Sequence, residues 1–286
     1  MTSVQLPRHV FGSTQVLVPK VGLGTWHLEL SDAPTDIAAV RAALDLGLTH
    51  VDTAELYGSG KAESLVGQAI EGRRDEVFLV SKVIPSNASR AGTISHCEQT
   101  LKRLRTDRLD CYLLHWPGSY PLEDTIAALE ELVAAGKTRA WGVSNFDEAE
   151  LQSALEIAGP GRIACNQVLY HLEERSIEHA VVPWCERNGV AIVGYTPYGQ
   201  QRQFPPRGLG GALLTEIAER HGFTPRQVAL AFLTRRPGFF AIPKSTNLEH
   251  LRENAGGAQL ALGPQDLSAI ERAFPLGPRR SGVPML

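Results

Sequence analysis

Four side chains that can take part in moving a proton stand at or just beyond the ends of three consecutive apolar runs. Asp52 and Tyr57 lie in and after the run that begins at Thr49, and Lys82 and His115 stand at the ends of the next two runs. A free phenol has a pKa of about 10, and a nearby ammonium favours the phenolate and lowers that pKa. We predict a chain in which the Asp52 carboxylate holds the Lys82 ammonium beside the Tyr57 hydroxyl.

Such a chain suits the reduction of a carbonyl group. Tyr57 would act as the general acid, and neutral His115 would donate a second hydrogen bond to the carbonyl oxygen, so that both stabilise the developing alkoxide. The electrons must then come from a bound hydride carrier. The sequence lacks the residues that metal-dependent or glycosidase chemistry would need. The sequence shows no His/Cys ligand set for a metal, and its candidate carboxylate pair, Asp52 and Glu55, lies on one loop, whereas a glycosidase needs carboxylates that flank one bond.

Each of these residues also has a structural explanation when it is taken alone. Asp52 could cap a helix, and Tyr57 could be an aromatic at the edge of the core. Lys82 could extend its amine from a strand end into solvent, and His115 could be a hydrogen-bonded core histidine. The joint occurrence of all four at neighbouring strand ends favours the catalytic interpretation.

The elements that must position these residues follow a strict alternation of short apolar runs and amphipathic stretches. Eight runs, rich in Val, Leu and Ile, read as strands buried on both faces of a parallel sheet; they begin at Val21, Thr49, Val77, Leu109, Thr138, Ala164, Ala191 and Phe239. The stretches between them have the apolar spacing of helices. This pattern predicts an α/β fold, a (β/α)8 TIM barrel, with an open doubly wound sheet as the alternative.

Two features lie outside the repeat. The segment VFGSTQVLVP, from Val10, predicts a small hairpin that turns at Gly12–Ser13. The long interval after the seventh strand and the C-terminal stretch predict additional helices. Because no linker divides the chain, we expect a single domain over residues 1–286. In such barrels the carboxyl ends of the strands carry the active site, which is where the polar residues fall.

Composition limits the partners and the compartment. The 286 residues carry 28 basic and 31 acidic side chains, a net charge of −3, which argues against nucleic acid as the main partner. No apolar run is long enough to span a membrane, and MTSVQLPRHV lacks the apolar core of a signal peptide, so we expect a cytoplasmic protein. The 4 cysteines are scattered, without a CxxC pair, and we expect buried thiols rather than disulfides or a zinc site.

The sequence resembles the aldo-keto reductase family along essentially its whole length. The matching motifs follow one another at barrel spacing: GLGTW from Gly22, DTAELYG from Asp52, the strand ending in Lys82, LLHWP from Leu113, GVSNF from Gly142, NQV from Asn166, YTPYG from Tyr195 and IPKST…HLREN from Ile242. Position by position, the resemblance implies that the catalytic residues are Asp52, Tyr57, Lys82 and His115. The stretches VLYHL and VPWC are most similar to bacterial members that reduce methylglyoxal-type dicarbonyls.

The resemblance also implies a site for NADPH without a Rossmann GxGxxG motif. Ser144, Asn145 and Gln167 would hold the carboxamide, and Tyr195 would stack on the nicotinamide. The remaining cofactor residues would be Gly24, Thr25, Trp26, Asp52, Thr196, Pro197, Tyr198, Gly199, Lys244, Ser245, Thr246, His250, Glu253 and Asn254. In the loop after Gly199, Arg202 and Arg207 are predicted to be solvated, with closure over the cofactor as the alternative.

One position departs from the family pattern. Many members have an Arg where this chain has His250. Arg grips a phosphate with two parallel hydrogen bonds and is always charged, whereas His is neither bidentate nor permanently charged. We therefore expect NADPH to be preferred, because Lys244 remains, but less strongly than in Arg-bearing relatives, so that NADH could also serve.

The expected substrate is a small carbonyl compound. Only PGSY separates Trp116 from the next helix, and about a dozen residues follow the last helical segment near Phe274. Such short walls predict an open cleft for small aldehydes and α-ketoaldehydes such as methylglyoxal. The residues expected to contact substrate are Trp26, Tyr57, Ile84, His115 and Trp116. We expect a monomer. The alternative function is a cofactor-sensing, regulatory subunit with this fold and little turnover.

Overall fold

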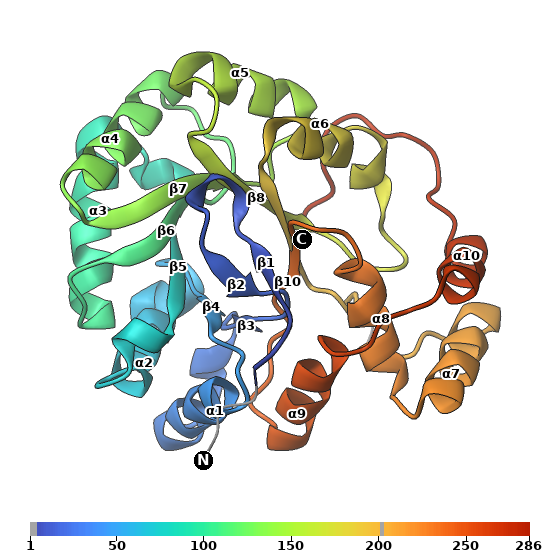
Figure 1. The fold of residues 1–286 in the computed structure, drawn as a ribbon. Helices are drawn as coiled ribbons and strands as arrows, with labels where there is room; N and C mark the ends of the chain where they lie inside the picture. The colour runs from blue at the N-terminus through green and yellow to red at the C-terminus, as the bar shows by residue number, and fades with distance from the viewer. Residues whose placement is uncertain (1–4, 201–202) are drawn as a thin grey trace.

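The computed structural model describes residues 5–200 and 203–286, and its centre is a sheet of eight parallel strands (Figure 1). Their hydrogen-bonded order follows the chain, so each strand pairs with the next one. The strands are β3 (Leu23–Gly24), β4 (His50–Asp52), β5 (Phe78–Val83), β6 (Leu109–Leu114), β7 (Thr138–Ser144), β8 (Ile163–Leu169), β9 (Ala191–Tyr195) and β10 (Phe239–Ala241). Each coincides with one of the eight apolar runs.

The sheet closes on itself between its first and last strands. Val21, just before β3, forms a parallel bridge to Ala241, and Gly24, in β3, forms one to Lys244. The Gly22 N–H donates to the Ala241 carbonyl at 2.8 Å. This closure confirms the predicted (β/α)8 barrel and excludes the alternative, an open doubly wound sheet.

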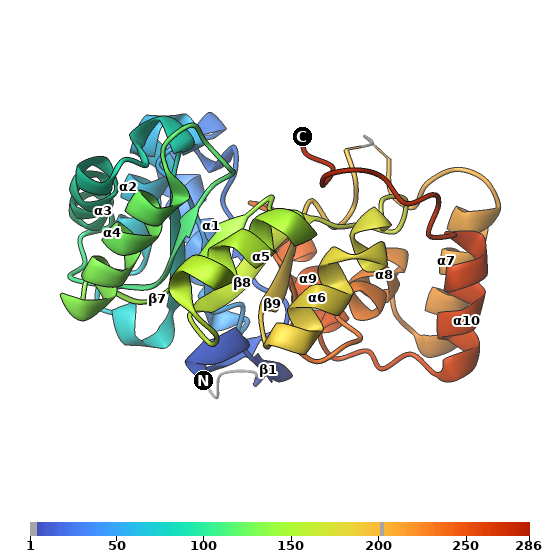
Figure 2. The same ribbon diagram turned by 90° about the horizontal axis from the view of Figure 1, so that it is seen from above.

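Helices surround the barrel, and they include the two additions that the sequence predicts. α7 follows β9 as an extra helix, and α10 follows α9 near the C-terminus (Figures 1 and 2). The helices are α1 (Ala33–Asp45), α2 (Lys61–Ala69), α3 (Arg90–Leu104), α4 (Leu122–Ala134), α5 (Glu148–Ala158), α6 (Val181–Asn188), α7 (Leu209–His221), α8 (Pro225–Leu233), α9 (Leu248–Gly257) and α10 (Pro264–Ala273).

The predicted hairpin covers the amino-terminal end of the barrel. β1 (Arg8–Val10) and β2 (Leu17–Pro19) pair in antiparallel register around a 3-10 turn, η1 (Gly12–Thr14). Phe11 is fully buried among barrel aromatics, with its ring centroid 4.6 Å from that of Phe78. Gly12 has φ +51°, and a Cβ there would lie 1.9 Å from the Ala164 carbonyl oxygen, so the turn requires glycine.

The alternation of side chains along the strands separates two apolar layers. On β5, Phe78 and Val80 pack in the barrel interior, whereas Leu79 and Val83 belong to the larger cluster between strands and helices. Because side chains of a strand alternate between its faces, Lys82 shares the interior face with Phe78 and Val80. An ammonium is thereby placed directly above an apolar core.

No helix among the described residues is long and apolar enough to cross a membrane. The four cysteines are free and buried, as expected. The prediction of a single domain over the whole chain stays a prediction.

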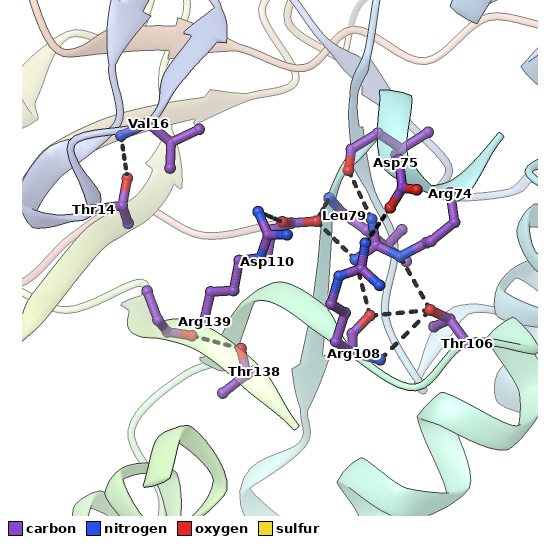
Figure 3. A network of polar contacts seen from close by, with 12 residues as sticks. Thr14, Val16, Arg74, Asp75, Leu79, Thr106, Arg108, Asp110, Thr138 and Arg139 are labelled. Carbon is purple, nitrogen blue, oxygen red and sulfur yellow. Dashed lines mark hydrogen bonds and ion pairs between the residues drawn. The ribbon is translucent and has the colours of Figure 1, made fainter. Parts of the chain in front are cut away.

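A carboxylate joins three strands at the amino-terminal end of the barrel (Figure 3). Asp110, on β6, is 3% exposed. It accepts hydrogen bonds from the Leu79 N–H of β5 at 2.9 Å and from Arg74 Nη2 at 2.8 Å. Its other oxygen lies 3.2 Å from Arg139 Nη1 of β7. Since no reacting group lies at this end, we assign Asp110 to stability.

We predict that Asp110→Asn lowers the free energy of unfolding by about 1–3 kcal/mol, because two guanidinium groups lose their carboxylate in a buried setting. Urea unfolding measures the change. The control is Asp107→Asn, where the side chain is 83% exposed and forms a surface ion pair with Arg108, and where we expect a change within about 0.5 kcal/mol. Equal effects of the two substitutions would contradict the assignment.

Candidate functional site

Asp52, Tyr57 and Lys82 meet at the carboxyl end of the barrel. Lys82 Nζ donates to Asp52 Oδ1 at 2.6 Å, to the Tyr57 hydroxyl oxygen at 3.2 Å and to the Thr53 carbonyl at 2.9 Å. Lys82 is fully buried and Asp52 is 1% exposed. The predicted chain of carboxylate, ammonium and phenol is therefore present in the geometry.

The local sequence explains how Tyr57 reaches this position. Its loop leaves β4 after Asp52 and turns through η3 (Tyr57–Gly60) into α2. Gly58 and Gly60 have φ of +55° and +87°, and a Cβ on Gly58 would lie 2.4 Å from Glu29 Cγ. The turn therefore depends on residues without a side chain.

Burial sets the protonation of the three groups. Burial raises the pKa of Asp52, while Lys82 and Gln167 act in the opposite direction. Burial alone lowers the pKa of Lys82, but Asp52 and Tyr57 outweigh it and raise that pKa above its usual value, so Lys82 keeps its positive charge at neutral pH. Burial raises the pKa of Tyr57 despite the ammonium. The ammonium lowers the pKa of this phenol, as expected, but the effect of burial is larger, so Tyr57 keeps its proton at neutral pH.

His115 follows β6 directly and shares the cavity with Tyr57, with ring centroids 5.9 Å apart and an interplanar angle of 74°. Burial lowers its pKa to about 2, and the positive charge of Lys82 adds to this effect. The imidazole is therefore neutral at physiological pH, as the sequence analysis predicts. Its Nδ1 is buried with no partner among the described residues.

The amide and hydroxyl side chains of the next strands connect to the same carboxylate. Gln167, on β8, donates from Nε2 to Asp52 Oδ2 at 2.7 Å. Ser144, at the end of β7, donates to the Gln167 carbonyl at 2.9 Å, and Tyr195 donates to Asn145 Oδ1 at 2.8 Å. One hydrogen-bonded layer thus runs across the strand ends from Tyr57 to Tyr195.

A cavity of about 790 Å³ lies above this layer. It is lined by most of the residues predicted to bind cofactor or substrate: Gly24, Thr25, Trp26, Asp52, Tyr57, His115, Trp116, Ser144, Asn145, Gln167, Tyr195, Thr196, Pro197, Tyr198, Gly199 and Lys244. Trp26 is 43% exposed, which leaves its ring available to a ligand. Cavity lining and predicted site therefore agree in the region around the catalytic groups.

Six of the residues predicted to bind cofactor or substrate do not line this cavity, and neither does the predicted catalytic residue Lys82, which is fully buried. Ile84 instead donates its backbone N–H to Glu55 at 2.9 Å. Ser245, Thr246, His250, Glu253 and Asn254 lie beyond Lys244, on the turn into α9 and on α9 itself. Asn254 accepts a hydrogen bond from Tyr198 at 2.6 Å, and Glu253 accepts one from Thr224. Their predicted contacts with the adenosine end of a cofactor stay predictions.

Sequence reasoning missed the C-terminal segment. Met285 and Leu286 line the cavity, about half exposed, and Figure 2 shows the chain running from α10 back toward the barrel. The segment is held by Arg175, which donates to the Phe274 carbonyl at 2.8 Å, and by an ion pair of Arg280 with Glu174 at 3.2 Å. The short C-terminal segment thus contributes two residues to the wall, and the prediction of an open cleft stays a prediction.

No periodicity or motif marks these two residues as part of the site, because they meet it only in space. His27, Leu56 and Gln200 also line the cavity without having been predicted. Arg207 is exposed, as expected, whereas Arg202 lies outside the described residues. Within the described part of the chain, no group of three His, Cys, Asp or Glu residues could hold a metal ion.

Comparisons with known proteins find similar sequences. The family model described as the aldo/keto reductase family matches residues 20–274. Methylglyoxal reductase YeaE of Escherichia coli (strain K12) is 42% identical over 96% of this chain and 97% of that protein. Glyoxal reductase of Bacillus subtilis (strain 168) is 34% identical over 90% of this chain and 89% of that protein.

Solved structures are also similar. A crystal structure of an aldo/keto reductase from Klebsiella pneumoniae in complex with NADP and acetate has a TM-score of 0.92 at 42% identity, over 98% of this chain and all of that one. A second Klebsiella pneumoniae structure, in complex with NADPH, has a TM-score of 0.91 at 41% identity, over 99% of this chain and all of that one. The expected resemblance in sequence and fold is confirmed.

We predict that Asp52→Asn lowers the free energy of unfolding by about 3–5 kcal/mol, because the Lys82 ammonium would stay buried without its carboxylate. Asp52→Asn combined with Lys82→Met should lose less than Asp52→Asn alone, since no uncompensated charge remains. Guanidinium unfolding of the single and double variants measures both values. Additive losses in the double variant would show that the ion pair does not determine the stability of this layer.

Proposed function

Because this chain belongs to the aldo/keto reductase family and is an oxidoreductase, we propose that it reduces methylglyoxal and related small α-ketoaldehydes with NADPH. The observation that carries the proposal is that Asp52, Tyr57 and His115 line one cavity, while the buried Lys82 ammonium contacts both Asp52 and Tyr57. The names of relatives such as methylglyoxal reductase YeaE support the substrate class. The NADP-bound Klebsiella pneumoniae structures support the cofactor.

The donor set of the cavity fits a nicotinamide dinucleotide. Asn145 and Gln167 carry primary amides and Ser144 a hydroxyl, which are the group types that can form hydrogen bonds with a carboxamide. All three line the cavity, and so does Tyr195, whose hydroxyl donates to Asn145. Lys244, exposed at the cavity edge, supplies a cation for phosphate. The amino terminus of α9 begins just beyond it, and helix amino termini favour anions.

The side chains of the protein supply the proton and the hydrogen bonds that the reduction of a carbonyl group needs. When bound, NADPH supplies a hydride, and therefore both electrons, to the carbonyl carbon. Tyr57 delivers its proton to the carbonyl oxygen, and Lys82 stabilises the resulting phenolate through the contact at 3.2 Å. Neutral His115 is suited to donate a hydrogen bond to the same oxygen. Trp26, Trp116 and Met285 are suited to exclude water from the small substrate.

We predict that wild-type protein oxidises NADPH when methylglyoxal is added and that Tyr57→Phe reduces kcat by about 100-fold or more, because the proton donor is removed. The NADPH dissociation constant, measured by fluorescence quenching, should change little. Turnover by Tyr57→Phe close to that of wild type would contradict the assignment of the acid. A wild-type protein that binds NADPH without turnover would instead favour the regulatory subunit considered in the sequence analysis.

We also propose that this protein prefers NADPH over NADH, but less strongly than relatives that have Arg at the position of His250. His250 is exposed in the first turn of α9, where it offers neither the permanent charge nor the bidentate geometry of Arg. Lys244 keeps one cation for the 2′-phosphate. The expected monomeric state, the cytoplasmic location and the absence of a nucleic-acid partner stay predictions.

We predict that His250→Arg raises the ratio of kcat/KM for NADPH to that for NADH by about tenfold, because a guanidinium can bind the 2′-phosphate with two charged hydrogen bonds. Steady-state kinetics with both cofactors measure the ratio. His250→Gln is the control, since it removes the imidazole without adding charge and should leave the ratio nearly unchanged. An unchanged ratio in His250→Arg would show that this position does not contact the phosphate.

A further inference from the structure

The loop that carries Tyr57 contains a second buried carboxylate that the reaction does not use. Glu55 stands between Asp52 and Tyr57 and is 8% exposed, yet it does not line the cavity. Its backbone N–H donates to the Lys82 carbonyl at 3.4 Å. The side chain is therefore in the catalytic loop without being in a position to touch a ligand.

The carboxylate of Glu55 binds three groups from outside its own loop. Oε1 accepts the backbone N–H of Ile84 at 2.9 Å and the Asn87 Nδ2 donor at 3.0 Å. Oε2 lies 2.6 Å from His96 Nδ1 on α3. These partners belong to the turn after β5, which contains η5 (Pro85–Asn87), and to the helix that follows it. Glu55 thus ties the loop after β4 to two later elements.

The conformation of this loop depends on contacts with other elements of the structure. Ser59, which is not glycine, has φ +53°, a conformation that L-residues rarely adopt and that the surroundings must enforce. The contact between Tyr57 and Lys82 is 3.2 Å long, at the upper end of hydrogen-bond distances. A displacement of about 1 Å can cost a catalytic group roughly 100-fold in rate. The position of Tyr57 is therefore sensitive to how the loop is held.

We propose that Glu55 is a positioning residue for the reaction: its carboxylate, bonded to Ile84, Asn87 and His96, fixes the loop so that the Tyr57 hydroxyl stays on Lys82. His96 lies on the solvent side of this hydrogen-bonded cluster: its side chain is 28% exposed, whereas the Glu55 side chain is 7% exposed. The inference rests on the proposed role of Tyr57 as the acid. Glu55 itself transfers no proton to substrate.

The test compares Glu55→Ala, Glu55→Gln and His96→Leu in the full chain, with NADPH and methylglyoxal as probes. Glu55→Ala should lower kcat by about 10- to 100-fold, because Tyr57 is no longer held on Lys82. The NADPH dissociation constant should change less than about twofold, because the predicted cofactor residues other than Asp52 lie on other strands and their loops. Glu55→Gln should recover part of the loss, since its amide oxygen can still accept the Ile84 N–H.

A readout without cofactor or turnover separates positioning from general destabilisation. In hydrogen exchange, the amides of residues 53–57 should exchange faster in Glu55→Ala, while those of β7 stay as in wild type. Asp110→Asn is the matched control, because Asp110 is also a buried carboxylate that accepts a backbone N–H from β5. It should lower stability and leave kcat per folded molecule unchanged.

The outcomes decide the inference. Unchanged kcat in folded Glu55→Ala, or an equal loss in Glu55→Ala and Glu55→Gln, would overturn it. If Glu55→Ala does not fold, Glu55→Gln and His96→Leu carry the test. In these two variants, a fall in kcat of about threefold or more with faster exchange of residues 53–57 supports the proposal, and a smaller fall overturns it. Absence of turnover in the wild type would overturn the proposed function, and turnover by Tyr57→Phe close to that of wild type would overturn the assignment of the acid. Loss of turnover in Tyr57→Phe with full activity in Glu55→Ala would overturn only the role of Glu55.

Discussion

The ion pair between Lys82 and Asp52 is the constraint on which the rest of this site depends. Two charges at 2.6 Å, both essentially without exposure, must recover a large desolvation cost from each other and from further hydrogen bonds. The carbonyl of Thr53 and the amide of Gln167 supply these bonds. Because these hydrogen-bond partners of the ion pair come from strand ends or from the loops after them, the pair connects several strands at the carboxyl end of the barrel.

The barrel in turn makes the pair possible. The interior face of β5 presents Phe78, Val80 and Lys82 in succession, so the apolar core ends where the charged layer begins. The low dielectric of such a core strengthens the attraction between the charges and keeps the pKa of His115 low. At the opposite end, Asp110 joins three strands without contributing to the chemistry. Stability and reactivity are thus placed at separate ends of the same strands.

The surroundings of the pair divide into parts with different tasks. Gln167, Ser144 and Asn145 connect the carboxylate to the part of the cavity proposed for the cofactor. Glu55 connects the proposed acid to the neighbouring loop and helix. Met285 and Leu286 complete the cavity from the far end of the chain. Each connection crosses between elements, so no single loop contains a complete site.

The eight strands, the hairpin, the added helices and the four proposed catalytic residues could all be predicted from the amino-acid sequence. These features follow from local patterns: apolar runs, helical spacing, glycine turns and motifs at strand ends. Tertiary structure alone decided the pKa direction of Tyr57, since burial and the ammonium oppose each other and only the packed site sets their balance. It also decided that Ile84 binds Glu55 instead of lining the cavity, and that Met285 does line it. Those outcomes depend on distances between residues far apart along the chain, and such distances exist only once the barrel has closed.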